Sequence, residues 1–381
     1  MSSEALAKLE TLAKWGFLHF DLPMNFSLKI DYWLLAPVVI LTFIGLATLA
    51  SINPLYFRNQ IISLIISVVF FLIISQINIS SLKILKNPLY IVSLVLLLIV
   101  LIIGIESRGA VRWVEFLGIR IQFSETLKPL LSLSFAAFIS DNKNPTFKTL
   151  LIAIVFLLPV IIMIYLQPDL GSALIYTAVF FLALIVIGFP IYWFGITALP
   201  AILLSPLFWT MLHEYQRQRI LTFFQLNRDP LGASYNSIQA LIAVGSGMFS
   251  GKGLGEGTQS ILRFLPERHT DFIFATISEG MGFVGGLIII LAFLFLLYRI
   301  YFIFIENNSL FEKIFLICCF FFFLIQFFLN VGMNIGLLPV VGVTMPFVSF
   351  GGSSLMSSFI FLAIASSISI SHKKRNVLEI R

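Results

Sequence analysis

Long runs of apolar residues recur along almost the whole of this 381-residue chain and constrain its fold more than any other feature. A run of about 20 apolar residues can cross the hydrocarbon core of a bilayer as an α-helix. The runs are continuous rather than alternating, which excludes the strands of a membrane β-barrel. Charged residues make up 11% of the chain, whereas soluble domains carry about 25%. The sequence therefore predicts an all-α polytopic membrane protein.

These runs predict about ten transmembrane helices. Pro200 and Pro206 are expected to kink the seventh helix. The ninth and tenth helices are separated by residues 336–344, which contain Pro339 and glycines and could instead form a re-entrant turn. The predicted ranges are 32–51, 59–77, 88–105, 122–140, 147–166, 170–188, 191–211, 272–299, 312–335 and 345–371.

An even number of helices places both termini on the same side of the membrane. Cytoplasmic loops are enriched in Lys and Arg, and most of these residues fall on the side that holds the termini, so both termini are expected in the cytoplasm. That side carries Lys8, Lys14, Lys29, Lys83, Lys86, Lys143, Lys148, Arg299, Lys313, Lys373, Lys374, Arg375 and Arg381, against Arg58, Arg108, Arg112 and Arg120 in the short outer loops.

Residues 212–271 form a large outer loop between the seventh and eighth helices of this topology. The loop breaks the pattern, because it carries cations on the outer side, and an anionic substrate there would explain them. The net charge of +6 is spread over membrane loops, so we expect an anionic lipid or lipid-linked phosphate as partner, and no nucleic acid. The cations of the loop are Arg217, Arg219, Arg228, Lys252, Arg263 and Arg268.

One membrane domain over residues 31–371 is the simplest organisation of the chain. A cytoplasmic arm over residues 1–30 precedes it and a cytoplasmic tail over residues 372–381 follows it. The arm has no short apolar core with a cleavage site, so no signal peptide is predicted. Cys318 and Cys319 lie within an apolar run and are expected to fill space in a helix.

The most polar stretch of the chain, residues 251–273, ends where an apolar run begins. Asp271 stands at this boundary, partly removed from water, which suits a carboxylate to accept a proton. The alternative is that Asp271 caps the following helix. Lys252, Arg263 and His269 are further candidates for substrate contact. Glycines 251, 253, 255 and 257 could let the backbone approach a phosphate, or could simply make a flexible loop.

A second polar group, Glu125 and Lys128, lies in the fourth predicted helix. The two residues are three positions apart on one helical face, and ionisable residues inside a membrane are usually functional. The alternative is a structural ion pair that fixes helix packing. Pro129 is expected to disturb the helix beside them.

Three further segments offer polar groups with competing interpretations. Asp169, in QPDL, could contact substrate or cap the sixth helix. Arg112, in RGAVRW, could bind substrate or anchor the chain beside Trp113 at the interface. Arg217 and Arg219 suit a diphosphate, which guanidinium groups bind through forked hydrogen bonds, although lipid headgroup contact is the alternative. The segment PFVSFGGSS (346–354) could serve close helix packing or line a polar path.

Nucleotide-binding and zinc motifs are missing from the sequence. The energy for any reaction must therefore come from the substrate or from an ion gradient.

Five segments together resemble the SEDS family of bacterial membrane glycosyltransferases: SETLKPL, QPDLGSALI, GKGLGEGTQS, FLPERHTDFIF and GLLPVVGVTMPFVSFGGSSL. They are more similar to the rod-shape branch (RodA) than to the division branch. The resemblance implies ten transmembrane helices, polymerisation of lipid II outside the bacterial inner membrane, and a class B penicillin-binding protein and the elongation machinery as partners. It implies that Asp271 is catalytic and that Glu125, Lys128, Arg217 and Arg219 bind substrate. Val111 stands where the family has a basic residue.

This resemblance leads to a mechanistic hypothesis of a single inverting displacement. Asp271 takes the proton of the acceptor hydroxyl, whose oxygen attacks the donor sugar. Arg217 and Arg219, with Arg263 or a divalent cation such as Mg²⁺ or Mn²⁺, neutralise the departing undecaprenyl diphosphate. No covalently bound cofactor is expected. The alternatives are a lipid II flippase, which the same cations would serve, and a non-catalytic scaffold of the cell-wall machinery.

Overall fold

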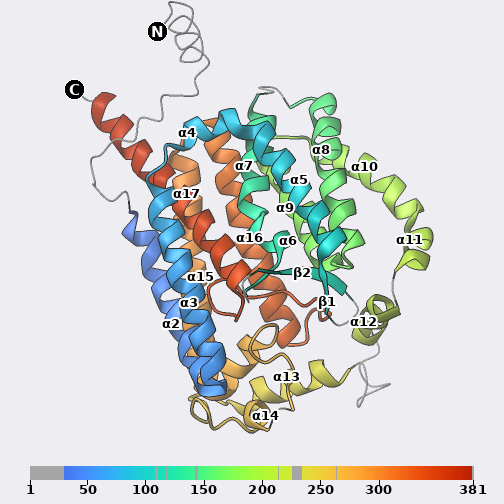
Figure 1. The fold of residues 1–381 in the computed structure, drawn as a ribbon, viewed down its shortest axis with the longest axis vertical. Helices are drawn as coiled ribbons and strands as arrows, with labels where there is room; N and C mark the ends of the chain where they lie inside the picture. The colour runs from blue at the N-terminus through green and yellow to red at the C-terminus, as the bar shows by residue number, and fades with distance from the viewer. Residues whose placement is uncertain are drawn as a thin grey trace, which may run out of the picture.

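A computed structural model describes residues 30–107, 110–116, 119–141, 145–212, 214–224, 234–262 and 264–379. The predicted N-terminal arm, apart from Ile30, and Arg263 lie outside this part of the chain. The described residues are mostly helical (Figure 1). The long helices are α2 (Tyr32–Ile52), α3 (Pro54–Ser75), α5 (Lys86–Ile103), α8 (Phe147–Leu166), α9 (Leu170–Val186), α15 (Ile273–Glu306), α16 (Leu310–Asn334) and α17 (Gly352–Glu379).

Every predicted range contains a helix or a pair of helices. Among the described residues, seven helical segments are long and apolar enough to cross a membrane, and three shorter apolar helices cover residues 128–140, 170–186 and 191–200. These apolar helices confirm a helical polytopic membrane protein. The number of ten crossings stays a prediction, because the three shorter helices fall below the usual spanning length.

Two of the predicted helices are broken, and a proline follows each break. The fourth range contains α6 (Phe123–Thr126) and α7 (Lys128–Ser140), with Pro129 in the first turn of α7. The seventh contains α10 (Ile191–Leu203) and α11 (Ser205–Met211), with Pro206 in the first turn of α11. Proline lacks an N–H and favours the first turn of a helix, so each helix restarts at its proline as the sequence predicts.

The tenth predicted range, 345–371, is wrong at its start. Residues 335–351 are not helical, and α17 begins only at Gly352. Phe347 has a φ of 66° within this stretch, which is incompatible with a continuous helix. The re-entrant turn that was the alternative for residues 336–344 falls within this non-helical segment and stays a prediction. At its other end α17 continues to Glu379, through most of the predicted tail.

A small antiparallel sheet is a feature that the sequence did not predict. It joins β1 (Ile105–Ser107), β2 (Ala110–Phe116) and β3 (Ile119–Ile121) in the order β1-β2-β3. The cross-strand pair of Glu115 and Arg120 carries an ion pair of 3.3 Å between Oε2 and Nε. The sheet lies between α5 and α6 (Figure 1), where only a loop was expected.

Arg299 was assigned to a cytoplasmic loop, and that assignment is wrong. Helix α15 runs on to Glu306, so Arg299 lies inside it and is buried. Its Nη2 lies 2.5 Å from Oδ2 of Asp31, which also accepts a hydrogen bond of 2.6 Å from Ser369. The buried pair ties the start of α2 to α15 and α17.

The two ends of the helix bundle differ in the segments that they hold. The start of α2 and the later turns of α17 meet at one end through the Asp31 contacts, and α4 (Ile79–Leu82) lies near them (Figure 1). Helices α13 (Tyr235–Ser246) and α14 (Thr258–Ile261) lie at the opposite end. Hydrogen bonds from Lys83 and Lys86 at the first end hold the pKa of Asp141 below its ordinary value. This arrangement agrees with the prediction that both termini lie on the same side of the membrane. That this side is the cytoplasm stays a prediction.

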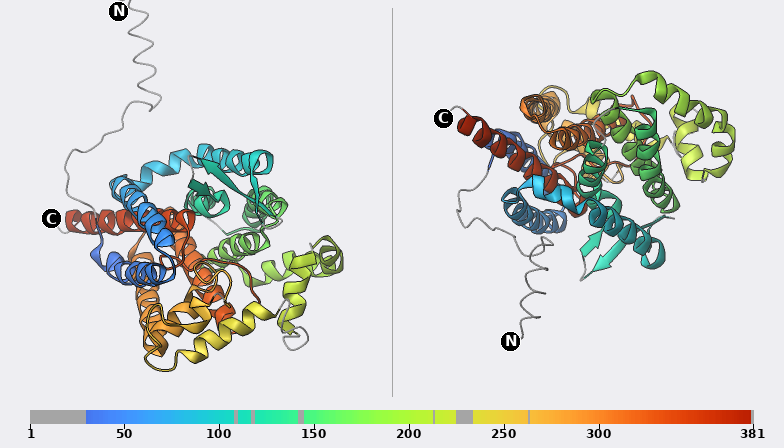
Figure 2. Two further views of the ribbon diagram at one scale, coloured as in Figure 1. Left: turned by 60° about the horizontal axis from the view of Figure 1, so that its bottom comes forward. Right: turned by 90° about the horizontal axis from the view of Figure 1, so that it is seen from above.

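Helix α17 lies at the centre of the bundle. Its most apolar stretch is 89% buried, more than that of any other candidate span in the described chain. It packs along α3, as the views in Figures 1 and 2 show. Small residues such as Ser353, Ser354, Ser357 and Ser358 are buried there, so close packing between helices explains this part of the GGSS segment.

Candidate active site

Asp271 lies immediately before α15 and is not its capping residue. Phe272 occupies the N-cap position and the helix has no side-chain cap. The backbone carbonyl of Asp271 accepts hydrogen bonds from Asn330 Nδ2 at 3.1 Å and Asn334 Nδ2 at 3.0 Å. Two buried amides of α16 therefore fix the backbone at this position. The structure assigns the N-cap position to Phe272, which argues against the capping alternative for Asp271.

Arg219 is the cation that the structure brings to Asp271. A Cβ atom added to Gly342 would lie 3.4 Å from Oδ2 of Asp271 and 3.7 Å from Nη1 of Arg219, so both atoms border one small space. Arg219 belongs to α12 (Glu214–Phe224), and its Nη1 donates to the carbonyl of Val341 at 3.1 Å. Gly342 itself has a φ of 77°, which glycine adopts without strain.

Asp271 and Arg219 bring opposite charges to one place. Asp271 stands at the N-terminal end of α15, where the helix dipole places partial positive charge. The guanidinium of Arg219 adds a full positive charge nearby. A carboxylate in this place can accept a proton, and the adjacent cation can stabilise an anion that forms beside it.

The non-helical segment 335–351 holds the residues before Asp271 in place. Ser349 Oγ donates to the carbonyl of Thr270 at 2.7 Å, and the N–H of Phe350 donates to the carbonyl of His269 at 2.8 Å. The ring of His269 stacks on Tyr56 with centroids 4.2 Å apart. This stacking gives His269 a positioning role, and its contact with substrate stays a prediction.

Arg217 does not share the environment of Arg219. Its Nε donates to the carbonyl of Trp209 at 2.9 Å and its Nη2 to that of Thr210 at 2.6 Å. It therefore fastens α12 to the end of α11. The predicted pairing of these two arginines on a single diphosphate stays untested, and Arg263 lies outside the described residues.

Asp169 and Arg112 both make structural contacts at the start of α9. Asp169 is the N-cap of α9 and accepts hydrogen bonds from Ser172 N at 3.2 Å and from Ser124 Oγ at 3.1 Å. Arg112 donates to the carbonyls of Gln167 and Pro168, and its Nη1 lies 4.0 Å from Oδ1 of Asp169. The capping interpretation of Asp169 is confirmed, and substrate contact by either residue stays a prediction.

Glu125 and Lys128 form a short, buried ion pair. Oε1 of Glu125 lies 2.6 Å from Nζ of Lys128, whose side chain is 1% exposed. Gln326 of α16 lies at hydrogen-bond distance, 3.5 Å, from Oε2 of Glu125. The geometry matches the structural ion pair that was the alternative to substrate binding.

Glu279 is a site residue that the sequence interpretation missed. It is fully buried in α15, and its carboxylate accepts hydrogen bonds from Gln259 N at 2.8 Å, Ser260 N at 3.0 Å and Ser260 Oγ at 2.6 Å. Nζ of Lys252 lies 3.8 Å from its Oε1. A carboxylate inside a predicted span was the signal available. Glu279 therefore anchors the end of the glycine-rich loop, residues 251–261, against α15.

The glycine-rich loop also rests on a kink in α15. Gly282 has a φ of 64° and a ψ of −161°, a region that is almost restricted to glycine. A Cβ there would lie 2.5 Å from the carbonyl oxygen of Phe249. The N–H of Gly253 donates to the carbonyl of Gly280 at 2.9 Å. Close contact between the two backbones therefore explains why glycine occupies positions 253, 280 and 282.

We predict that Gly282→Ala lowers the free energy of unfolding by about 1–3 kcal/mol, because alanine is strained in this backbone conformation. Denaturation of the purified protein in detergent measures the change. Gly195→Ala is the matched control: Gly195 lies within α10 with no neighbour within 4 Å, so alanine should be neutral or slightly stabilising. Equal stability of Gly282→Ala and the unmodified protein would contradict the prediction.

A divalent cation stays a prediction. Within the part of the chain that the structure describes, no three or more His, Cys, Asp or Glu side chains gather as a metal site. Mg²⁺ commonly binds through one or two carboxylates together with water and substrate phosphates. Asp271 beside a diphosphate would fit that mode, so Mg²⁺ or Mn²⁺ would come with the substrate.

Comparison with known proteins places the chain in a family. The model of the family described as "Cell cycle protein", which covers FtsW, RodA and SpoVE, matches residues 24–374. The peptidoglycan glycosyltransferase MrdB of Escherichia coli K12 is 38% identical over 292 residues, which are 76% of this chain and 78% of MrdB. A probable peptidoglycan glycosyltransferase FtsW of Hydrogenovibrio crunogenus is 31% identical over 352 residues, 88% of this chain and 90% of that protein.

Two solved structures have the same fold. One is a chain of a peptidoglycan synthase complex that coordinates polymerization and crosslinking, with a TM-score of 0.77, 28% identity, and coverage of 91% of this chain and 98% of that chain. The other is the rod shape determining protein RodA of Thermus thermophilus, with a TM-score of 0.67, 26% identity, and coverage of 92% and 98%. The family predicted from the sequence motifs is thus confirmed, and the chain belongs to the FtsW/RodA/SpoVE family of multi-pass bacterial membrane proteins.

Proposed function

We propose that this protein is a peptidoglycan glycosyltransferase that polymerises lipid II into glycan strands during cell elongation. The observation that carries the proposal is the convergence of Asp271 and Arg219 on the space beside Gly342. A base next to a cation is what the transfer of a sugar from a diphosphate donor requires. Relatives named peptidoglycan glycosyltransferase support the assignment, and the likeness to MrdB supports elongation.

The proposed reaction is a single displacement with inversion at the anomeric carbon. Asp271 takes the proton from the 4-hydroxyl of the acceptor sugar as its oxygen attacks the anomeric carbon of the donor. The bond to the undecaprenyl diphosphate breaks, and that group leaves with the electron pair. Arg219 neutralises the charge that develops on the diphosphate. No nucleotide is needed, because the leaving group carries the free energy.

The direct test is polymerisation of purified lipid II by the protein in detergent. Lengthened glycan strands would establish the activity and would set aside a flippase, because detergent leaves no bilayer across which to move lipid. A non-catalytic scaffold predicts no strands at all. The assay should be run with and without Mg²⁺ or Mn²⁺, and with and without a class B penicillin-binding protein. We propose that transpeptidase as a partner because a similar chain is part of a synthase complex.

Arg219 and Arg217 are expected to differ in this assay. We predict that Arg219→Gln lowers kcat/KM for lipid II by about 10- to 100-fold, which corresponds to one lost charge-assisted hydrogen bond. Arg217→Gln should change kcat/KM less than tenfold, because this guanidinium already serves the carbonyls of Trp209 and Thr210. Rates should be compared for folded protein of equal concentration. A larger loss of kcat/KM for Arg217→Gln than for Arg219→Gln would assign the contact with the diphosphate to Arg217 instead.

We place the protein in the bacterial inner membrane with both termini in the cytoplasm. The ion pairs of Lys83 and Lys86 with Asp141 lie at the end of the bundle that we assign to the cytoplasm. Asp271 and the glycine-rich loop then lie at the outer end of the bundle. Lipid II reaches them there within the surrounding membrane lipids, on the side where the elongation machinery assembles the wall.

A further inference from the structure

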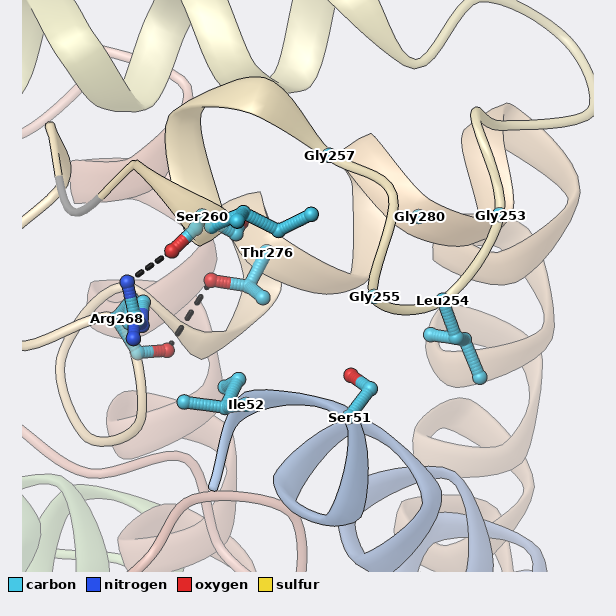
Figure 3. Close-up of a pocket in the computed structure, with 11 residues that line it drawn as sticks. Ser51, Ile52, Gly253, Leu254, Gly255, Gly257, Ser260, Arg268, Thr276 and Gly280 are labelled. Carbon is cyan, nitrogen blue, oxygen red and sulfur yellow. Dashed lines mark hydrogen bonds between the residues drawn. The ribbon is translucent and has the colours of Figure 1, made fainter.

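A cavity of about 250 Å³ lies between the end of α2 and the glycine-rich loop (Figure 3). Ser51 and Ile52 of α2 form one wall. The loop from Gly253 to Ile261 forms the opposite wall, and Arg268, Thr276 and Gly280 close the space between them. The cavity is separate from the space beside Gly342, which Asp271 and Arg219 border.

The walls of this cavity are held by hydrogen bonds. Arg268 Nη1 donates to the carbonyl of Ser260, and Thr276 Oγ1 donates to the carbonyl of Arg268 at 3.1 Å (Figure 3). Behind the loop, Glu279 binds the N–H groups of Gln259 and Ser260. The cavity is therefore built into the fold, and its shape does not depend on one flexible loop.

The lining suits a neutral group with many hydroxyls. Ser51, Ser260 and Thr276 each donate their hydroxyl hydrogen within the protein, to Thr48, Glu279 and Arg268, so their oxygens remain as acceptors for the hydroxyls of a ligand. Ile52 and Leu254 supply apolar surface for the face of a ring. The carboxylate of Glu279 lies directly behind Gly257 in the wall, because a Cβ on Gly257 would lie 2.5 Å from its Oε2. A carboxylate behind the wall disfavours an anion, so a sugar fits this cavity better than a phosphate does.

The size and place of the cavity relate it to the proposed reaction. Its volume lies below the roughly 300–1,000 Å³ of pockets that enclose drug-sized ligands, so it can take one sugar residue and not a whole lipid-linked disaccharide peptide. Arg268 in its wall is three residues before Asp271 in a segment fixed by segment 335–351. The wall of the cavity and Asp271 therefore belong to the same short stretch of chain.

We propose that this cavity binds a sugar residue of the growing glycan strand, away from the bond being formed. The inference rests on the proposed polymerase function and adds a strand-holding site to it. Such a site keeps the strand bound between successive additions. It should therefore govern the length of the product more than the rate of the first coupling.

Filling the cavity tests this assignment. Ser51→Phe should shorten the strands made from lipid II at least threefold in mean length, with the initial rate of the first coupling within about twofold of the unmodified protein. Ala50→Phe is the matched control, because Ala50 is the exposed neighbour of Ser51 on α2. Strands of normal length from Ser51→Phe would overturn the proposal, as would equal losses of rate and length. Absence of any polymer from the unmodified protein would instead contradict the function itself.

A second measurement does not depend on activity. The sequence holds two cysteines, Cys318 and Cys319, and both are buried, so Ser51→Cys introduces one accessible thiol. Soluble glycan strands should slow its alkylation by a maleimide at least fivefold, and inorganic pyrophosphate should not. Ala50→Cys should react without protection. Protection by pyrophosphate alone would identify the cavity as an anion site. Absence of protection by glycan strands would mean that the cavity does not bind them. Either result would overturn the inference.

Discussion

Asp271→Asn is expected to lower the polymerisation rate of purified lipid II by about 10²- to 10⁴-fold, the usual contribution of general acid–base catalysis. Asparagine has nearly the same shape but cannot take the proton of the acceptor hydroxyl. The fold should survive, because the contacts that Asn330 and Asn334 make here are with the backbone carbonyl of Asp271. Initial rates of strand synthesis, with thermal unfolding as a check on folding, measure both expectations.

The control for this variant is Asp141→Asn. Asp141 lies at the opposite end of the bundle, where it pairs with Lys83 and Lys86. Loss of its charge should therefore leave the polymerisation rate within about twofold of that of the unmodified protein. Near-normal strands from Asp271→Asn would remove Asp271 from the role of base. A large loss from both variants would point to a general effect of carboxylate removal on the protein.

The helical layout could be predicted from the sequence because membrane spans depend on local composition. Each apolar run must satisfy its own backbone as a helix, and prolines such as Pro129 and Pro206 mark the breaks. The family motifs predict a catalytic role for Asp271, and this role stays a prediction. Local information was enough for these features, since none of them depends on a distant partner.

Other parts of the site depend on contacts between residues far apart in the chain. Arg219 and Asp271, far apart in the chain, both border the space beside Gly342 of segment 335–351. Glu279 is satisfied by backbone N–H groups about twenty residues earlier, and Arg299 is buried because Asp31 lies opposite it. A sequence pattern carries no signal for such pairings, so the sequence interpretation misplaced Arg299 and missed the sheet of β1, β2 and β3. For Glu279 the charge inside a predicted span was a signal, but the partners of its carboxylate could not be predicted.

Replacing one partner of the Glu125–Lys128 pair is expected to destabilise the protein by about 3–5 kcal/mol. The ions lie 2.6 Å apart and are nearly excluded from solvent, so Lys128→Met leaves Glu125 buried without its counter-charge, which is a large cost. Glu125→Gln should do the same to Lys128. Denaturation in detergent, followed through the loss of helical signal, measures each change.

The double variant Glu125→Gln/Lys128→Met separates a structural pair from a substrate contact. Neutral residues of similar volume commonly replace a buried ion pair without loss, so the double variant should recover most of the stability that either single variant loses. It should also polymerise lipid II at close to the normal rate, because Lys128 is 1% exposed and cannot reach a substrate from this position. A stable but inactive double variant would show that the pair acts on the substrate after all, through a conformation in which the fourth predicted helix opens at the break before Lys128.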